Sequence, residues 1–389
     1  MGVVEPIFPL LALCARAQGH PVQAALLREH AQALQQWDDL PAQAEAHGLV
    51  PLLLTHLQLA GVPLPPATKQ QLLGYFMQHA HAAQVRARVL AEILTCYQAA
   101  GIEVLILKGA ALAHLIYPQP MLRPMRDIDI LVRAEDVYRA YARLPEIGFI
   151  HPPGAHSGLG PDHHHLTAIK RVADGFSVSV EVHHALHLNE RGHPLRFEAY
   201  APTAQSFTVG SMPAKTLGRE ETLWHIYRHA FCMQVTYEPL RLIWAADLIS
   251  LAEAWVDALD WERVRRQYPA AYNILPLLHS LSPWSEAVLE RLKLPIGRLP
   301  SGAGAGYAGW PRFTFTQQPA KRAQQILRDS LFPSPWWLRM HYGQGPSRWG
   351  YGRAWLAHQR WLAGQIGFVL TREARQIVRR WITKRQLER

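Results

Sequence analysis

Cysteine is scarce in this sequence, with only three among 389 residues. Cys14, Cys96 and Cys232 are far apart, their number is odd, and no CxxC pair is present. A disulfide framework or a zinc site made of cysteines is therefore not expected, and the composition fits a reducing compartment. We predict a cytoplasmic protein.

The sequence also lacks a long apolar run. No uncharged stretch of about 18 apolar residues is present, which argues against a membrane-spanning helix. The first residues do not combine a basic segment with a long apolar run, so no secretory signal is expected. Hydrophobic residues nevertheless make up 49% of the chain. The protein can therefore bury a substantial core, and global disorder is not expected.

Acidic residues are fewer than basic ones, and the net charge is +10. Residues 341–389 alone hold ten Lys and Arg against two Asp and Glu. This excess of positive charge favours an anionic partner such as nucleic acid, a phosphorylated substrate or an anionic membrane surface. A basic helix face that is exposed to solvent explains the excess of positive charge equally well. Tryptophans alternate with these arginines and suit base stacking, peripheral membrane association or ordinary packing: Trp336, Trp337, Trp349, Trp355, Trp361 and Trp381.

The pattern of the chain changes twice. Residues 1–99 are rich in Ala, Leu and Gln, with apolar residues at three- and four-residue spacing, which predicts helices on both sides of a Pro-rich break at 62–66. Residues 100–215 are expected to form a compact α+β unit, because predicted strands alternate with helices. Residues 216–389 return to a helical pattern, interrupted by a Gly-rich stretch at 301–306 that is expected to be a flexible loop.

The elements of the middle region follow from its apolar pattern. Residues 102–107 and 128–132 are predicted to be buried strands, and 176–182 alternates polar and apolar residues as a half-buried strand does. Helices are predicted over 110–117 and 136–144.

Three acidic residues lie on two of these strands. Side chains alternate between the faces of a strand, so Asp127 and Asp129 point the same way while Ile128 points into a core. In the strand 176–182, Glu181 lies on the face opposite the valines and can approach the aspartates if the two strands are neighbours. Adjacent carboxylates repel each other unless a cation lies between them. We therefore predict that these three residues bind Mg²⁺, or Mn²⁺, for in-line phosphoryl displacement.

Basic residues and a glycine precede the aspartates. Lys108 and Gly109 lie at a predicted strand-to-helix turn, where backbone N–H groups bind phosphate well, and Ala110 begins the helix. Arg123 and Arg126 flank the carboxylates and can hold a triphosphate. We predict that these five residues bind the nucleotide.

These motifs resemble those of the DNA polymerase β-like nucleotidyltransferases, which have a Gly-containing turn, an Asp-x-Asp strand and a third acidic residue on a later strand. The chain is similar to a poorly characterised bacterial branch marked by a Leu-Lys-Gly turn, an Arg-Pro-x-x-Asp-Ile-Asp-Leu-like strand and a Val-Glu-Val-His-like strand. A downstream helix from Leu240 to Leu248 also resembles that branch. Over residues 100 to 255 the matching residues occur in the same order: Lys108, Gly109, Arg123, Asp127, Asp129, Glu181 and His183.

The chain departs from the usual pattern at the turn. Gly109 is followed by Ala110 where Gly-Ser or Gly-Gly is more common, and it lies 18 residues before Asp127, a longer spacing than usual.

The resemblance implies an α+β fold in which a small polymerase β-like nucleotidyltransferase core, a mixed sheet with helices, is flanked by helical N- and C-terminal regions. It also implies an enzyme that moves a nucleoside monophosphate from an NTP such as ATP to the hydroxyl of an acceptor, with pyrophosphate leaving. The acceptor, whether a small molecule, a protein or RNA, is encoded in no motif. Two alternatives stay open: a catalytically degenerate fold that binds a nucleotide or a partner, and a toxin-like enzyme that modifies tRNA.

Histidines gather near the third acid. His183 shares the predicted strand face of Glu181 and is a candidate for an acceptor-side contact. The histidines at 163–165 and 183–184, with His187 nearby, allow a metal site or a general base, but a triple-histidine run suits a loop equally well.

Three polar residues in the C-terminal region have a simpler explanation. His225 and His229 lie four apart on one face of a predicted helix without a metalloprotease pattern, so packing or surface polarity is expected. Asp247 lies amid apolar residues on another helix. We expect it to bond to a neighbouring helix, although a role in orienting a base is the alternative.

Overall fold

The computed structural model describes most of the chain, namely residues 7–152, 165–172, 175–186, 195–232, 241–296, 331–344 and 349–364. Among these residues no helix is both long and apolar enough to cross a membrane. Several predicted features lie outside the described residues: His163, His164, His187, the Gly-rich stretch at 301–306, Trp381 and the end of the basic tail from 365 onward.

The N-terminal region is helical, as predicted. Four of its helices have a proline at the first or second helical position. Proline suits the first turn of a helix, because a backbone N–H at that position would have no hydrogen-bond partner within the helix. The region contains α1 (Ile7–Leu13), α2 (Pro21–Ala33), α3 (Leu40–Ala46), α4 (Val50–Leu59) and α5 (Pro66–Ala99).

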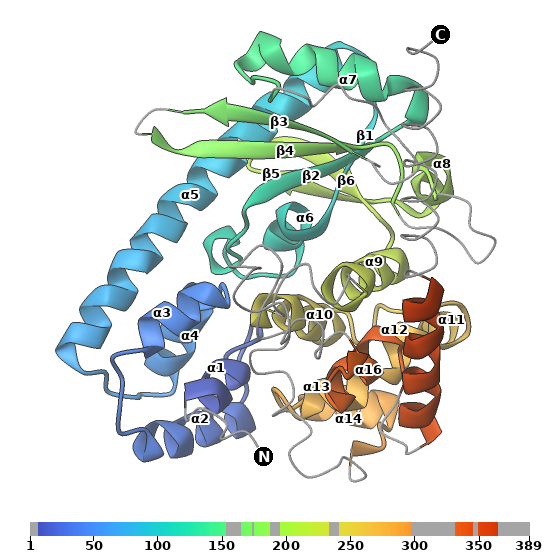
Figure 1. Cartoon of the computed structure of the whole chain (residues 1–389). Helices are drawn as coiled ribbons and strands as arrows, with labels where there is room; N and C mark the ends of the chain where they lie inside the picture. Colours follow the sequence, from blue (N-terminus) through green and yellow to red (C-terminus); the bar gives the residue numbers. More distant parts are fainter. Residues whose placement is uncertain are drawn as a thin grey trace, which may run out of the picture.

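The 34-residue helix α5 takes part in two hydrophobic cores. Leu72, near its start, packs with the other N-terminal helices. Val89, Ile93 and Tyr97, in its second half, pack against the sheet of the middle region. Figure 1 shows α5 running from the N-terminal helices to the sheet. The boundary predicted at residue 99 therefore falls at the end of a helix whose second half belongs to the core of the sheet.

A four-stranded mixed sheet forms the centre of the middle region. Its strand order is β1-β2-β4-β3. β2 is antiparallel to β1 and parallel to β4, and β3 is antiparallel to β4. The predicted mixed sheet is thus confirmed, and the strands that carry the acidic residues are neighbours. The strands are β1 (Val104–Ile106), β2 (Asp127–Val132), β3 (His165–Arg171) and β4 (Ser177–His183).

Two strand regions were not predicted from the sequence. β3 begins at His165, inside the triple-histidine run, and its Leu166 and Ala168 are buried in alternation. β5 (Gln205–Val209) and β6 (Met212–Thr216) form a separate hairpin. The Thr216 hydroxyl donates to the Ile106 carbonyl at 2.5 Å, which attaches this hairpin to β1.

The helices around the sheet begin and end close to the predicted positions. α6 (Lys108–Leu115) starts two residues before the predicted Ala110, and α7 (Val137–Arg143) lies within the predicted 136–144. The residue with the left-handed backbone at the strand-to-helix turn is Lys108, with φ +48°, rather than Gly109. The turn was therefore predicted at the right place but assigned to the wrong residue.

The C-terminal helices share one hydrophobic core with the N-terminal helices. Trp336 and Trp337 are buried in this core, whereas Trp349 is 82% exposed. Packing therefore explains the first two tryptophans of the basic tail. The helices of this region are α9 (Arg219–Phe231), α10 (Leu242–Ala254), α11 (Trp261–Gln267), α12 (Pro269–Asn273), α13 (Leu275–His279), α14 (Glu286–Leu292), α16 (Pro335–His341) and a helix over 349–364. The short helix α8 (Phe197–Tyr200) belongs to the middle region and packs in a separate small core with Leu105 and Leu131 of the sheet.

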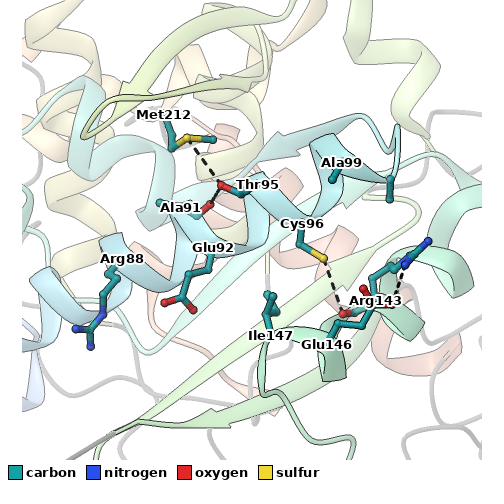
Figure 2. Close-up of a pocket in the computed structure, with 11 residues that line it drawn as sticks. Arg88, Ala91, Glu92, Thr95, Cys96, Ala99, Arg143, Glu146, Ile147 and Met212 are labelled. Atoms are coloured by element: carbon teal, nitrogen blue, oxygen red, sulfur yellow. Dashed lines mark hydrogen bonds and ion pairs between the residues drawn. The ribbon is translucent and has the colours of Figure 1, made fainter.

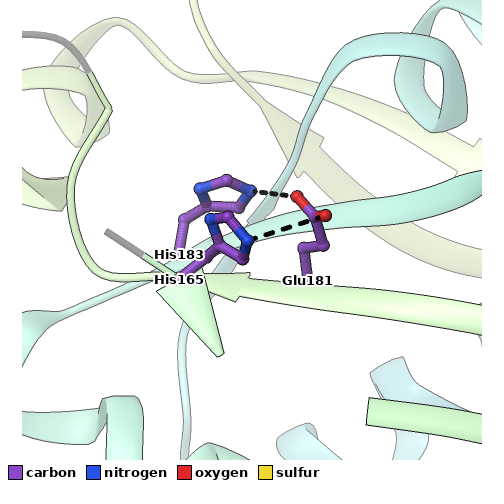
Figure 3. Close-up of side chains that lie close together, drawn as sticks. All are labelled: His165, Glu181 and His183. Atoms are coloured by element: carbon purple, nitrogen blue, oxygen red, sulfur yellow. Dashed lines mark ion pairs between the residues drawn. The ribbon is translucent and has the colours of Figure 1, made fainter. Parts of the chain in front are cut away.

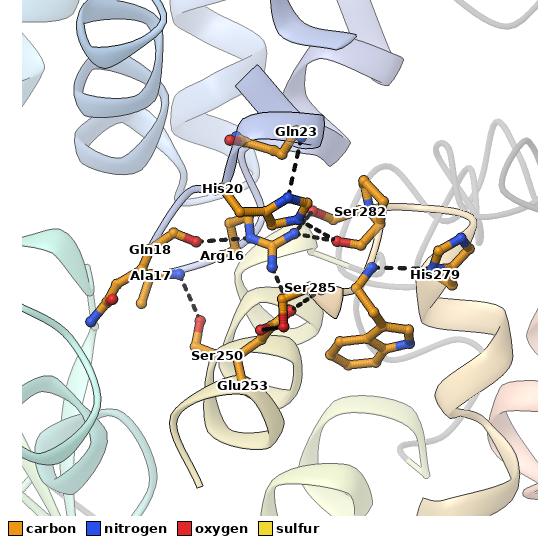
Figure 4. A network of polar contacts seen from close by, with 12 residues as sticks. Arg16, Ala17, Gln18, His20, Gln23, Ser250, Glu253, His279, Ser282 and Ser285 are labelled. Atoms are coloured by element: carbon orange, nitrogen blue, oxygen red, sulfur yellow. Dashed lines mark hydrogen bonds and ion pairs between the residues drawn. The ribbon is translucent and has the colours of Figure 1, made fainter. Parts of the chain in front are cut away.

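A buried arginine ties the two helical regions together (Figure 4). Arg16 is 1% exposed, and its guanidinium donates to Glu253 at 2.5 Å and to Ser282 Oγ at 3.1 Å. The carbonyl of Arg16 in turn contacts Nε2 of the buried His56 at 2.8 Å. Because a buried charge is tolerated when it is paired and hydrogen-bonded, this network fixes the segment between α1 and α2 against α10.

Candidate active site

The two aspartates of β2 are arranged as the strand period requires. Ile128 and Ile130 are buried in the core of the sheet, and Asp127 and Asp129 alternate with them. In the parallel pairing of β2 with β4, Asp129 is the direct partner of Glu181. The structure thus brings the three predicted carboxylates to one patch, where their negative charges act on one another.

Lys108 neutralises the most buried of these carboxylates. Its Nζ donates to Asp129 Oδ1 at 2.7 Å. Burial opposes the positive charge of Lys108, but the charge and hydrogen bond of Asp129 outweigh it and raise the Lys108 pKa. The left-handed backbone of Lys108 costs on the order of 1–3 kcal/mol for a residue with a side chain. Strain of this kind at a charged residue of the site fits a functional position, because it fixes where the ammonium group lies.

Two histidines adjoin the carboxylates (Figure 3). His183 Nε2 lies 2.9 Å from Asp129 Oδ1 and 3.4 Å from Glu181 Oε2. His165, on β3, points its Nε2 at the same carboxylate, 3.7 Å from Glu181 Oε1. Burial alone lowers the His183 pKa, but the hydrogen bond to Asp129 and the nearby carboxylate of Glu181 outweigh that effect and raise it. The predicted shared face of His183 and Glu181 is therefore present.

The pKa values of Asp127 and Asp129 are shifted in opposite directions. Burial disfavours the charged form of Asp129, yet Lys108 and His183 hold its pKa well below the usual value. For Asp127, burial and the Asp129 charge dominate and raise the pKa to about 6. Within the described part of the chain, Asp127 has no hydrogen bond or ion pair. It is therefore a carboxylate available to an external cation.

Arg123, for which a phosphate contact was predicted, forms an ion pair with Asp247. Its Nε and Nη2 donate to the two carboxylate oxygens of Asp247 at 2.8 Å and 2.5 Å, and Tyr117 donates to Asp247 Oδ1 at 2.8 Å. Arg123 and Asp247 are 6% and 1% exposed. The guanidinium is thus bound by Asp247 of α10, which is the structural bond expected of that aspartate.

Gly109 lies beneath this arginine. A Cβ atom at Gly109 would come within 2.8 Å of Arg123 Nη1. The glycine is therefore required by the close approach of Arg123 rather than by its own backbone angles. The arginine–aspartate pair fixes the first turn of α6, where the backbone N–H groups of Gly109 and Ala110 precede the first helical hydrogen bonds.

The other predicted residues are placed as follows. Arg126 is exposed one residue before β2, and its charge contributes, after His79 and others, to lowering the Glu45 pKa. The Ala110 side chain is buried in the core. His229 packs edge-on against Trp244, with ring centroids 5.7 Å apart, as the packing interpretation predicted.

The match to known families covers more than half of the chain. Residues 33–280 match the family described as "Uncharacterised nucleotidyltransferase". The chain belongs to this nucleotidyltransferase family. The resemblance to nucleotidyltransferases and the prediction of an enzyme are thereby confirmed.

Solved structures give distant matches to this nucleotidyltransferase. The solution structure of the antibiotic-resistance factor ANT(2'')-Ia is 16% identical and covers 51% of this chain and 98% of that one, with a TM-score of 0.35. The crystal structure of ANT(2'')-Ia in complex with adenylyl-2''-tobramycin is 15% identical over 48% and 97%, with a TM-score of 0.34. An antigenic nucleotidyltransferase-like protein from Paracoccidioides brasiliensis is 13% identical over 52% and 96%, with a TM-score of 0.30. No curated protein matches the chain. The family assignment rests on the sequence match.

The structure adds a cation that sequence reasoning missed in this nucleotidyltransferase. Arg86, on α5, stacks over the Phe176 ring at 5.0 Å, and its buried Nε has no hydrogen-bond partner within the described residues. Burial lowers the Arg86 pKa to about 10, and the charge of Asp127 partly offsets that effect. Because the charge of Asp127 acts on this guanidinium, Arg86 is a candidate contact for an anionic substrate. The Ala- and Gln-rich pattern of α5 contained no signal for this role.

The nucleotidyltransferase also has a cavity of about 660 Å³ beside α5 (Figure 2). Cys96, Arg143 and Met212 are among its lining residues. None of the site residues predicted from the sequence lines this cavity, so we do not assign it to the carboxylate site.

Proposed function

We propose that the protein catalyses the metal-dependent transfer of a nucleoside monophosphate from an NTP to an acceptor hydroxyl, with pyrophosphate leaving. One observation carries the proposal. Asp129 and Glu181 are direct partners on adjacent parallel strands, with Asp127 two residues from Asp129 on the same strand, in a member of a nucleotidyltransferase family. Three neighbouring carboxylates repel one another, and a bound divalent cation would offset that repulsion.

The donor set fits Mg²⁺, or Mn²⁺. Asp127 and Glu181 are carboxylates without a lysine or arginine ion pair among the described residues, and hard cations take oxygen ligands. We assign Asp127 and Asp129 as ligands on β2 and Glu181 as the ligand nearest the acceptor. When bound, the metal neutralises phosphate charge and favours loss of the acceptor proton. Glu181 would help to accept that proton, and His183 would hold the carboxylates in place through Asp129.

The nucleotide phosphates are assigned to the start of α6. The N–H groups of Gly109 and Ala110 lie at a helix N-terminus, which favours anions, and the Lys108 ammonium lies beside it. We assign Arg86 and Arg126 to the charge that develops on the leaving pyrophosphate. Arg123 then acts as a positioning residue that fixes the turn from beneath.

A labelling experiment tests this function and identifies the acceptor. The purified protein is incubated with each α-³²P-labelled NTP and Mg²⁺ in the presence of total RNA, total protein or a small-molecule extract. We expect label to enter one fraction with an equal amount of released pyrophosphate. Uptake by the RNA fraction selects an RNA-modifying enzyme. NTP binding in a thermal-shift assay without transfer into any fraction would contradict the proposal and favour a binding module.

A further inference from the structure

Two histidines and a glutamate converge on the edge strand β3 and its neighbour β4 (Figure 3). His165 on β3 lies directly opposite His183 on β4, and Glu181 lies two residues before His183 on the same strand. The His165 and His183 ring centroids are 4.9 Å apart. Because residues two apart on a strand share a face, the pairing aims all three side chains at one point.

The distances within this group suit a metal better than hydrogen bonds. One ligand atom from each residue lies within 4.8 Å of the other two. Nε2 of His165 is 3.7 Å from Glu181 Oε1 and Nε2 of His183 is 3.4 Å from Glu181 Oε2, both longer than a normal N–H···O bond. Ligands at about 2.0–2.1 Å from a tetrahedral ion lie roughly 3.3 Å from one another. Small movements would therefore place all three around one ion.

The chemistry of the donors indicates the class of metal. Two imidazole nitrogens and one carboxylate suit zinc, manganese and other divalent transition metals, whereas Mg²⁺ is held by oxygen. The His165 side chain is 38% exposed and the His183 side chain is 9% exposed, so one side of the group is open to solvent and the other is enclosed. If His183 gives its nitrogen to a metal, Asp129 keeps its ion pair with Lys108.

We propose that His165, Glu181 and His183 form a binding site for a divalent transition metal at the margin of the carboxylate patch. Glu181 is shared with the proposed Mg²⁺ ligands, but Asp127 is not part of this group. Metal binding here goes beyond the proposed function, because it is measurable without any nucleotide or acceptor.

Cobalt provides the probe, since Co²⁺ bound by nitrogen and oxygen ligands absorbs visible light. The full-length protein is titrated with CoCl₂ alone. We expect a saturable visible spectrum for the unmodified protein and a loss of Co²⁺ affinity of at least about tenfold in His165→Ala. His165→Gln, which keeps the size of the side chain, should show the same loss. His30→Ala, which removes a histidine of α2, should bind Co²⁺ within about twofold of the unmodified protein.

The outcomes distinguish this site from the proposed function. A protein without a saturable Co²⁺ spectrum, or a folded His165→Ala and His165→Gln pair that bind Co²⁺ as tightly as the unmodified protein, would overturn the metal site. Mg²⁺-dependent pyrophosphate release is measured in parallel. Turnover without Co²⁺ binding overturns this inference alone, and Co²⁺ binding without turnover supports it while contradicting the proposed function.

Discussion

Asp129 and Glu181 are direct partners across the parallel β2–β4 pair. Lys108 neutralises Asp129 at 2.7 Å, while among the described residues Glu181 is paired only with the two histidines at 3.4 Å and 3.7 Å. The protein's own lysine therefore balances one of the three carboxylates. The charge that remains on Asp127 and Glu181 is the physical reason to expect a cation at this site.

Gly109 should tolerate no side chain. In Gly109→Ala, the added Cβ would lie within 2.8 Å of Arg123 Nη1, which Asp247 prevents from moving freely. We expect a loss of stability of about 1–3 kcal/mol from overpacking, with reduced nucleotidyl transfer. Gly74→Ala is the matched control, because Gly74 lies inside α5 with nothing within 4 Å of its Cβ position. This variant should be about 0.5–1 kcal/mol more stable in urea unfolding. Equal stability of the two variants would contradict the close approach of Arg123.

The Arg123–Asp247 pair should matter more to stability than an exposed pair. Arg123→Met leaves the Asp247 carboxylate buried with Tyr117 as its one remaining partner in the described part of the chain, which should cost about 3–5 kcal/mol of unfolding free energy. The double variant with Asp247→Leu should recover part of that loss. Arg143→Met, which breaks the exposed pair with Glu146, should change stability by about 0.5 kcal/mol or less. A small effect of Arg123→Met alone would count against the assigned positioning role.

Arg86 should affect turnover more than folding. We expect Arg86→Ala to lower kcat/KM for the NTP by about 10–100-fold, because a cation near the phosphates is lost, and Arg86→Lys to restore part of the activity. Arg88→Ala is the control, since Arg88 is exposed on the same helix beside the cavity of Figure 2. Pyrophosphate release at several NTP concentrations gives these values. If Arg86→Ala is as active as Arg88→Ala, Arg86 does not contact the substrate.

His56 should make the protein sensitive to acid. Burial, more than the opposing bond to the Arg16 carbonyl, lowers the His56 pKa from 6.5 to about 4. The unfolded chain therefore binds the proton more tightly, and stability that is present above pH 6.5 is lost as the pH falls from that value toward 4. Between pH 7 and pH 5 the loss from this residue is about 2 kcal/mol.

Urea unfolding at the two pH values checks this expectation. His56→Gln should lose about 2 kcal/mol less between pH 7 and pH 5 than the unmodified protein. His81→Gln, which changes an exposed histidine, should follow the unmodified protein. A His56→Gln variant with the same pH dependence as the unmodified protein would show that His56 is not the group responsible.

The carboxylate patch could be predicted because it depends on a local rule. Alternation along a strand sets the faces of Asp127, Asp129 and Glu181 before any tertiary contact is known. Only the pairing of β2 with β4 had to be assumed, and the structure supplies it. The helical flanks and the strands β1, β2 and β4 were predictable because each has its own apolar period, whereas the mixed sheet was implied by the family resemblance.

The parts that could not be predicted depend on contacts between distant segments. Arg123 finds its partner Asp247 124 positions later, so its proximity to the aspartates in sequence pointed to phosphate instead. Arg86 lies on a helix that precedes the sheet, and nothing in the pattern of that helix indicated that the charge of Asp127 acts on it. The strand that begins at His165 was obscured by the histidine run before it, although its buried Leu166 and Ala168 alternate as in any half-buried strand.

The central claim is that the carboxylate patch binds the metal for nucleotidyl transfer, and Asp127→Asn tests it most directly. Asparagine keeps the size of the side chain and removes the charge, and Asp127 has no hydrogen bond or ion pair to lose within the described residues. The measurement is Mg²⁺-dependent pyrophosphate release, with thermal unfolding to verify the fold. We predict a folded variant whose turnover is at least about 10³-fold lower than that of the unmodified protein. A folded Asp127→Asn variant with undiminished turnover would contradict the account.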